Sequence, residues 1–316
     1  MENFEPQYPQ KPILVRKKSN RHFSITLFSM VLFALTLSLI TDDYVLIFII
    51  LGILILHEGG HFLMMKLFNY EELNMLFIPF FGAMVLGRKE KYSQIETALM
   101  VIAGPLPGIL LGASLLIYQW INPDYVSIQL GVLLIGLNVM NLLPIDPLDG
   151  GRLVRTLFFK QYELIQFVFS ILSSFAIIGL GLYFNAWIVI GIGFLLGYRI
   201  KNKHKLYLIR KEMKKEGIKF DVNYEDLSDK SFSKIKNIII EHTPILKEIE
   251  NHREAEDYGF IIAKQVDGVL FPPTKKDATT LFKTLILFLW LGGIVLSIYS
   301  FFITDINSIV DAFQGG

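Results

Sequence analysis

The feature that most constrains this chain is a series of uncharged apolar runs of about 20 residues. A run of that length can cross the bilayer's hydrocarbon core, about 30 Å thick, as a helix. Because 53% of the 316 residues are hydrophobic and only 19% are charged, the composition excludes an ordinary soluble fold and a disordered chain. The net charge of +1 excludes a basic nucleic-acid-binding protein. We therefore expect an all-α polytopic membrane protein.

The apolar runs predict about seven membrane crossings. The run at 164–198 would be about 52 Å long as one helix, which is too long for a single crossing, so we divide it at Asn185. The expected spans are 23–40, 44–67, 97–120, 125–145, 164–198 as two spans, and 285–303.

Lysine and arginine residues orient these spans, because cytoplasmic loops carry an excess of them. They gather in the head before the first span, at 88–91 and at 199–205, whereas Asp42, Asp43 and Asp124 fall on the opposite side. This pattern predicts a cytoplasmic N-terminus. The size and simplicity of the chain favour the cytoplasmic membrane of a bacterium.

We expect six segments along the chain. They are a cytoplasmic head at 1–21, an anchor helix at 22–43, a core at 44–155, two further membrane helices at 156–199, a small cytoplasmic domain at 200–280, and a last membrane helix with the tail at 281–316. Within the core, residues 76–86 are apolar but too short to cross and are interrupted by Pro79 and Gly82. Such a segment fits a short hairpin that re-enters the membrane inside the protein.

One expected membrane helix carries an HExxH motif at 57–61. Residues four apart share a helix face, so His57 and His61 can direct imidazole nitrogens at one metal ion. Glu58 lies beside them, where it can accept a proton from a metal-bound water. Ionisable residues inside a membrane helix are costly and usually functional. With no cysteine in the chain, thiolate zinc sites and cysteine nucleophiles are excluded.

A catalytic zinc site usually has a third protein ligand and leaves one position for water. Two carboxylates follow the 125–145 span, Asp146 and Asp149, in a segment rich in proline and glycine. Both lie toward the membrane face that is nearer to His57 and His61. Of the two, we favour Asp149 as the third ligand, with Asp146 as the alternative.

The HEGGH motif at 57–61 and the segment NLLPIDPLDGGR at 141–152 resemble those of the site-2 protease family of intramembrane zinc metalloproteases. The resemblance covers roughly residues 44–155. It implies a three-helix protease core, Zn²⁺ held by His57, His61 and Asp149, and Glu58 as general base. It also implies that Asn141 binds substrate or an oxyanion, and that the 76–86 hairpin pairs with an extended substrate.

Two positions depart from the family pattern. Gly108 stands where many members have an asparagine after the Ala-Gly-Pro motif at 103–105, and Asp146 adds a charge where an apolar residue or proline is common. The function that the resemblance implies is hydrolysis of peptide bonds in membrane-anchored proteins near the cytoplasmic face. The partners would be transmembrane protein substrates and the lipid bilayer, with no nucleic acid.

Two other functions are considered. A non-catalytic relative could keep the scaffold for binding, but a binder has no need of Glu58. A metal transporter would need polar residues along a path through both leaflets, and the outer halves of the core spans have almost none.

Overall fold

A computed structural model describes residues 8–14, 22–119, 121–122, 124–159, 162–250, 257–304 and 306–314. Most of the predicted head at 1–21, and the end of the tail at 315–316, lie outside the described residues. The chain divides into two compact units. The polar unit comprises the described parts of 1–18, 90–92 and 196–275, and the membrane unit comprises those of 19–89, 93–195 and 276–316.

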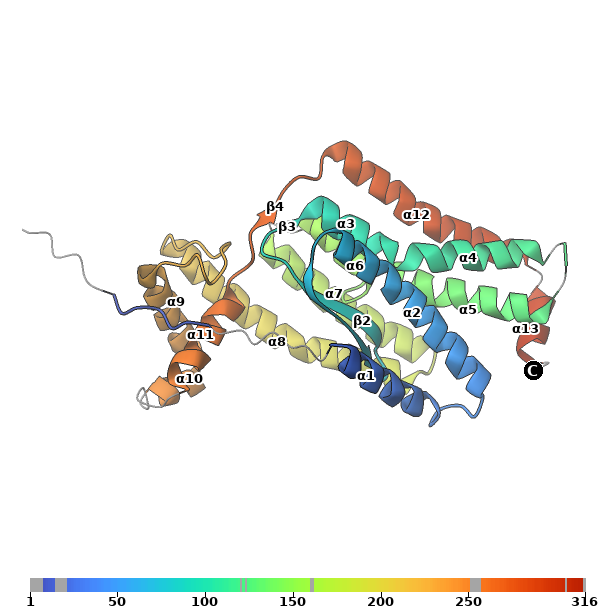
Figure 1. Ribbon diagram of the computed structural model, residues 1–316, viewed down its shortest axis with the longest axis horizontal. Coiled ribbons are helices and arrows are strands. Elements are labelled where there is room, and N and C mark those ends of the chain that lie inside the picture. The colour runs from blue at the N-terminus through green and yellow to red at the C-terminus, as the bar shows by residue number, and fades with distance from the viewer. Residues whose placement is uncertain are drawn as a thin grey trace, which may run out of the picture. The chain divides into compact units, whose positions relative to one another are not determined.

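The membrane unit is mainly helical (Figure 1). Its first half contains α1 (His22–Leu37), α2 (Tyr44–Leu67), β1 (Glu71–Ile78), β2 (Gly82–Arg88), α3 (Gln94–Ala103) and α4 (Pro105–Tyr118). Its second half contains α5 (Tyr125–Leu142), α6 (Asp149–Val154), the π-helix η1 (Arg155–Phe159), α7 (Glu163–Tyr183), α12 (Thr280–Ile303) and α13 (Ile306–Gln314). Helix α8 (Trp187–Lys215) begins in this unit and ends in the polar unit.

Among the described residues, five helical segments are long and apolar enough to cross a membrane. They are α2, α3 with α4 as one segment, α5, α7 and α12. Helix α1 is shorter, at 16 residues, and α8 continues from an apolar start into a charged stretch. The predicted count of seven crossings stays a prediction.

Large apolar side chains on these helices face away from the protein. Phe48 on α2, Phe175 on α7 and Phe288 on α12 are 73%, 69% and 70% exposed. Apolar surface that continues around several helices is not stable in water but is stable in lipid. The chain is therefore an integral membrane protein.

The break predicted in the 164–198 run is present. Helix α7 ends at Tyr183, and Asn185 has a φ of 53°, in the left-handed region that asparagine tolerates better than most residues. The N–H of Ala186 then donates to the carbonyl of Gly181 at 2.8 Å, which closes the turn before α8 begins.

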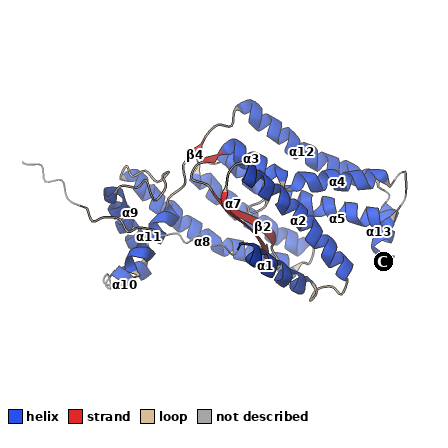
Figure 2. Ribbon diagram, viewed as in Figure 1, coloured by secondary structure: helices blue, strands red, loops and turns tan. Residues whose placement is uncertain are grey.

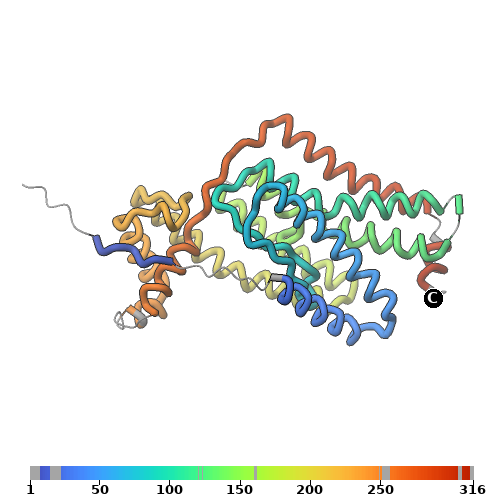
Figure 3. Tube along the Cα trace, in the orientation of Figure 1, coloured from blue at the N-terminus to red at the C-terminus, as the bar shows by residue number. Residues whose placement is uncertain are grey.

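Helices α4 and α5 pack backbone to backbone at two glycines. A Cβ on Gly112 would lie 2.9 Å from the carbonyl oxygen of Gly131, and a Cβ on Gly131 would lie 3.1 Å from that of Gly112. Small residues permit this approach in a membrane, where packing rather than the hydrophobic effect joins helices. Helix α12 runs beside α4, as the Cα trace in Figure 3 shows.

A β-hairpin follows α2, shown in red in Figure 2. Strands β1 and β2 are antiparallel, with Ile78 paired to Gly82 across a three-residue turn. The hairpin includes the predicted segment 76–86 but starts earlier, at Glu71. Its position relative to the bilayer stays a prediction.

The polar unit has its own core. It contains the second part of α8, α9 (Asp229–Glu241), α10 (Pro244–Glu250) and α11 (Tyr258–Val269). Along the sequence, the short strands β3 (Tyr92–Ser93) and β4 (Thr274–Lys275) fall at two of the positions where the chain passes from one unit to the other. Helix α9 is amphipathic, since its Ile235, Ile238 and Ile239 side chains are buried.

Residues 8–14 belong to this polar unit as well. The ammonium group of Lys11 donates to the carbonyls of Tyr224, Glu225 and Leu227 at 2.9, 2.7 and 2.6 Å. The hydroxyl of Tyr224 donates to the carbonyl of Pro12 at 2.7 Å. These bonds hold the described part of the head against a surface more than 200 residues away in sequence.

A carboxylate before α12 fixes the start of α3. Asp277 accepts hydrogen bonds from the Ser93 hydroxyl at 2.7 Å and from the N–H groups of Gln94 and Ile95 at 3.1 and 3.2 Å. Partial burial acts to raise the pKa of Asp277, but these hydrogen bonds outweigh it and hold the pKa below its usual range.

We expect Asp277→Asn to lower the melting temperature of the detergent-solubilised protein at pH 7 by about 2–4 °C. Because the folded-state pKa is depressed, the contribution is present above pH about 4 and is lost as the pH falls through the folded pKa. The difference between wild type and variant should therefore shrink at pH 3. A difference of the same size at both pH values would contradict this account.

Candidate metal centre

Two histidines one turn apart on α2 direct their rings toward the same point. His57 and His61 are 5% and 7% exposed, and their Nε2 atoms lie 3.2 Å apart. The backbone around them is closely packed because two neighbours lack a Cβ. A Cβ on Gly60 would overlap the carbonyl of Ala103, and one on Gly104 would overlap the ring of His61.

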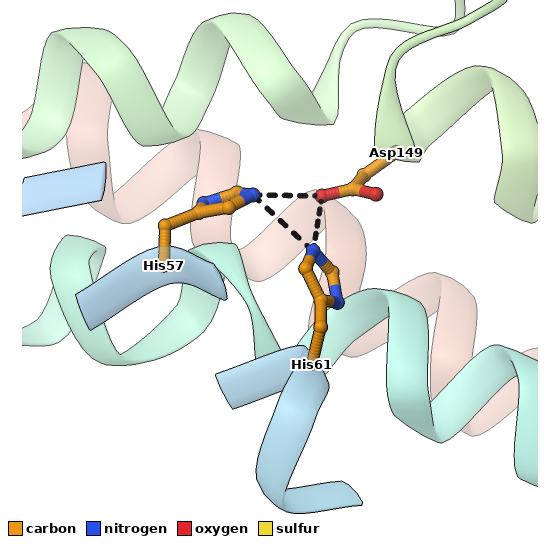
Figure 4. Close-up of side chains that lie close together, drawn as sticks. All are labelled: His57, His61 and Asp149. Atoms are coloured by element: carbon orange, nitrogen blue, oxygen red, sulfur yellow. Dashed lines mark hydrogen bonds and ion pairs between the residues drawn. The ribbon is translucent and has the colours of Figure 1, made fainter. Parts of the chain in front are cut away.

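Asp149, the first residue of α6, completes a group of three side chains (Figure 4). Its Oδ2 atom lies 3.1 Å from His57 Nε2 and 3.0 Å from His61 Nε2. The three atoms therefore form a nearly equilateral triangle. No other metal-binding group of three or more histidine or carboxylate side chains occurs among the residues that the structure describes.

The dimensions of this triangle fit a small metal ion. A tetrahedral zinc ion bonded at about 2.0–2.1 Å holds its ligand atoms about 3.3 Å apart, close to the 3.0–3.2 Å seen here. Two imidazoles and one carboxylate are also a ligand set that catalytic zinc sites use. A fourth position is then left for water.

The outer ring nitrogens of both histidines have acceptors. The Nδ1–H of His61 donates to the carbonyl of Met100 at 2.8 Å, and the Nδ1–H of His57 donates to Oδ1 of Asn138, also at 2.8 Å. A carbonyl can only accept, so Nδ1 must carry the proton and Nε2 keeps its lone pair for a metal. Sequence reasoning missed Asn138; its position as a polar residue inside an apolar span was the available signal.

The turn that carries Asp149 is held close to the end of α5. A Cβ on Gly150 would overlap the carbonyl of Leu142, and one on Gly151 would overlap the carbonyl of Ile145. The indole N–H of Trp290 on α12 donates to the same Leu142 carbonyl at 2.8 Å. Glycines at 150 and 151 thus permit a close turn, and α12 supports it.

Asp146, the alternative third ligand, is engaged elsewhere. Its Oδ1 accepts from Arg155 at 3.0 Å, and its Oδ2 accepts from the Ser170 hydroxyl at 3.0 Å. The structure does not place it in the group formed by His57, His61 and Asp149.

The two other predicted site residues differ in their surroundings. Glu58 is 5% exposed beside the histidines, and its carboxylate accepts a hydrogen bond from the backbone N–H of Val85 on β2. The side-chain amide of Asn141 donates to the carbonyl of Leu137 within α5 at 3.1 Å. No bond between Asn141 and the three clustered side chains is found among the described residues.

We expect the purified wild-type protein, offered zinc and then dialysed, to retain about one zinc ion per chain. Asp149→Ala should lose it, because the triangle loses a corner. Asp146→Ala should retain it, because that carboxylate bonds to Arg155 and Ser170 instead. Metal content by mass spectrometry tests both variants, and zinc lost from Asp146→Ala but kept in Asp149→Ala would contradict the assignment.

Comparisons with known proteins bear on this site. No family model matches the chain. A zinc metalloprotease of Methanocaldococcus jannaschii is 29% identical over 147 residues, which are 45% of this chain and 42% of that protein. Stage IV sporulation protein FB of Bacillus subtilis is 30% identical over 132 residues, or 40% of this chain and 44% of that protein. The chain thus matches less than half of the length of either relative.

Among solved structures, the site-2 protease from Methanocaldococcus jannaschii aligns with a TM-score of 0.42 and 23% identity, covering 56% of this chain and 88% of that one. The two curated relatives, together with the motifs at 57–61 and 141–152, confirm that the chain resembles the site-2 protease family of zinc metalloproteases.

Proposed function

We propose that this protein is an intramembrane zinc endopeptidase that hydrolyses peptide bonds of membrane-anchored proteins near the cytoplasmic face. The observation that carries the proposal is the triangle of His57, His61 and Asp149 atoms beside the buried carboxylate of Glu58. A zinc ion held there would polarise a scissile carbonyl and lower the pKa of bound water to about 7.

The residues around the triangle have distinct roles in this reaction. Glu58 takes the proton of the attacking water and later gives it to the leaving amine. The N–H of Val85 orients the Glu58 carboxylate from the hairpin side. We assign to Asn141 the stabilisation of the developing oxyanion, which requires its amide to turn away from the Leu137 carbonyl when substrate binds.

The depth of the site favours substrates that lie in the membrane. His57 and His61 precede the end of α2 at Leu67 by ten and six residues, or about 15 and 9 Å along the helix. The proposed topology has seven crossings, with the N-terminus and the 200–280 segment in the cytoplasm. The site then lies within the apolar layer, closer to its cytoplasmic side.

A helical substrate must unwind before its amides can react, and an extended segment needs new hydrogen-bond partners. One edge of the hairpin has no backbone partner among the described residues. On β1, the Ser29 hydroxyl accepts from the N–H of Phe77 at 3.1 Å, and the Thr26 hydroxyl donates to the carbonyl of Met75 at 2.6 Å. Side chains of α1 therefore occupy the outer edge of β1.

The open edge belongs to β2. Phe77 pairs with Ala83 and Met75 with Val85. In an antiparallel ladder, cross-strand partners direct their N–H and C=O groups alike, either both inward or both outward. The backbone N–H and C=O groups of Phe77 and Met75 point away from β2. Those of Ala83 and Val85 therefore point away from β1, on the side of Glu58. We infer that an extended substrate adds to this edge of β2, where it meets the catalytic carboxylate.

We expect Glu58→Gln to slow cleavage of a membrane-anchored substrate at least about 100-fold while zinc content stays near one per chain. Glutamine keeps the shape of the side chain but cannot accept the proton, and loss of a general base lowers rates by about 10²–10⁴-fold. Cleavage in proteoliposomes, measured beside metal content, tests this expectation. A fully active variant would contradict a hydrolytic role for Glu58.

We also expect Ala83→Pro to slow cleavage at least tenfold with unchanged zinc content. Proline at an outward-facing edge position leaves the bonds between β1 and β2 intact but removes the N–H offered to a substrate strand. Ala83→Val keeps that N–H and serves as the matched control. Equal rates for the two variants would contradict strand addition at β2.

A further inference from the structure

Asn138 is a polar residue buried in the middle of the membrane unit. It is 1% exposed and lies on α5, three residues before the Asn141 of the motif. Its only partners among the described residues are His57 and a carbonyl of its own helix. A side-chain amide in such a place destabilises a membrane helix unless its hydrogen bonds are made.

The orientation of this amide is determined by its two bonds. Nδ2 donates to the carbonyl of Leu134 at 2.8 Å, which can only accept, so Oδ1 must face His57. Oδ1 in turn accepts the Nδ1 proton of His57. This bond fixes both the tautomer and the ring rotation that direct the His57 Nε2 lone pair at Asp149 and His61.

The space for the amide comes from the neighbouring helix. A Cβ on Gly108 of α4 would overlap the side-chain nitrogen of Asn138, and it would lie 2.7 Å from Cγ and 3.0 Å from Oδ1. Any residue other than glycine at 108 would displace the Asn138 amide from this position. A side chain on position 108 would point at the volume that the Asn138 amide occupies.

We propose that Asn138 and Gly108 form an exchangeable pair, in which Asn138 on α5 positions His57 for zinc because Gly108 on α4 leaves room for its amide. An asparagine at 108 paired with a glycine at 138 would deliver an amide to the same ring nitrogen from the opposite helix. The inference rests on the proposed function, because it concerns how tightly the zinc centre is held.

The test measures zinc affinity by chelator competition on the full-length, detergent-solubilised protein. Asn138→Leu keeps nearly the same shape but offers no acceptor, and it should weaken zinc binding about 10–100-fold. Asn138→Ala, which adds no bulk beside Gly108, should give the same loss. The control Ser297→Ala, an equally buried polar residue on α12 that bonds to the Gly293 carbonyl, should bind zinc as the wild type does.

The exchanged variant Gly108→Asn with Asn138→Gly should recover at least half of the lost affinity on a logarithmic scale. Thermal unfolding of the zinc-free proteins separates positioning from folding: Asn138→Leu, which leaves the His57 Nδ1–H without an acceptor, should still unfold in a single cooperative transition as the wild type does. Unchanged affinity in both Asn138 variants, or no recovery in a folded exchanged variant, would overturn the inference alone. A wild type that binds no zinc would overturn the proposed function together with it.

Discussion

The structure depends on one constraint: two histidines and a carboxylate, arranged as a metal ion would need them, lie inside an apolar protein that lipid surrounds. Each buried nitrogen or oxygen that lacks a partner destabilises the fold by about 1–3 kcal/mol, and a buried charge does so by more. His57, His61 and Asp149 meet this constraint by turning inward on one another, 3.0–3.2 Å apart. Their lone pairs and the carboxylate charge are best satisfied by a cation at the centre.

The arrangement of the surrounding helices follows from the same constraint. The end of α3 supplies the Met100 carbonyl to one histidine, and α5 supplies Asn138 to the other. Such close contact requires glycine at 60, where the Ala103 backbone approaches, and at 104 and 108, where the side chains of His61 and Asn138 lie. The glycines that weaken these helices locally are therefore the residues that let them surround the centre. Helix α12 adds the Trp290 bond at the turn before Asp149.

Much of this arrangement is predictable because its signals are local in sequence. Apolar runs predict the long helices, the four-residue spacing of His57 and His61 predicts a shared face, and Asn185 marks a break within a run too long for one crossing. The hairpin begins earlier than predicted because the polar first half of β1, from Glu71 to Asn74, lacks the apolar signal.

Other features depend on contacts between distant residues. The motif favours Asp149 over Asp146 as the third ligand, but only the structure shows that Arg155 and Ser170 engage Asp146 instead. The role inferred for Asn138 depends on its hydrogen bond to His57, which is 81 positions away in the sequence. It also depends on Gly108 of a third helix, which leaves room for the Asn138 amide. The bonds from Lys11 to the segment at 224–227 link the head to a distant domain, and no local pattern indicates them.

The most direct test of the central claim is the zinc K-edge X-ray absorption spectrum of the zinc-loaded protein. The account predicts four nitrogen or oxygen ligands at about 2.0–2.1 Å, two of them imidazoles, with one imidazole lost in His57→Ala. A spectrum with no imidazole contribution, or one that His57→Ala leaves unchanged, would contradict a metal centre built from α2 and Asp149.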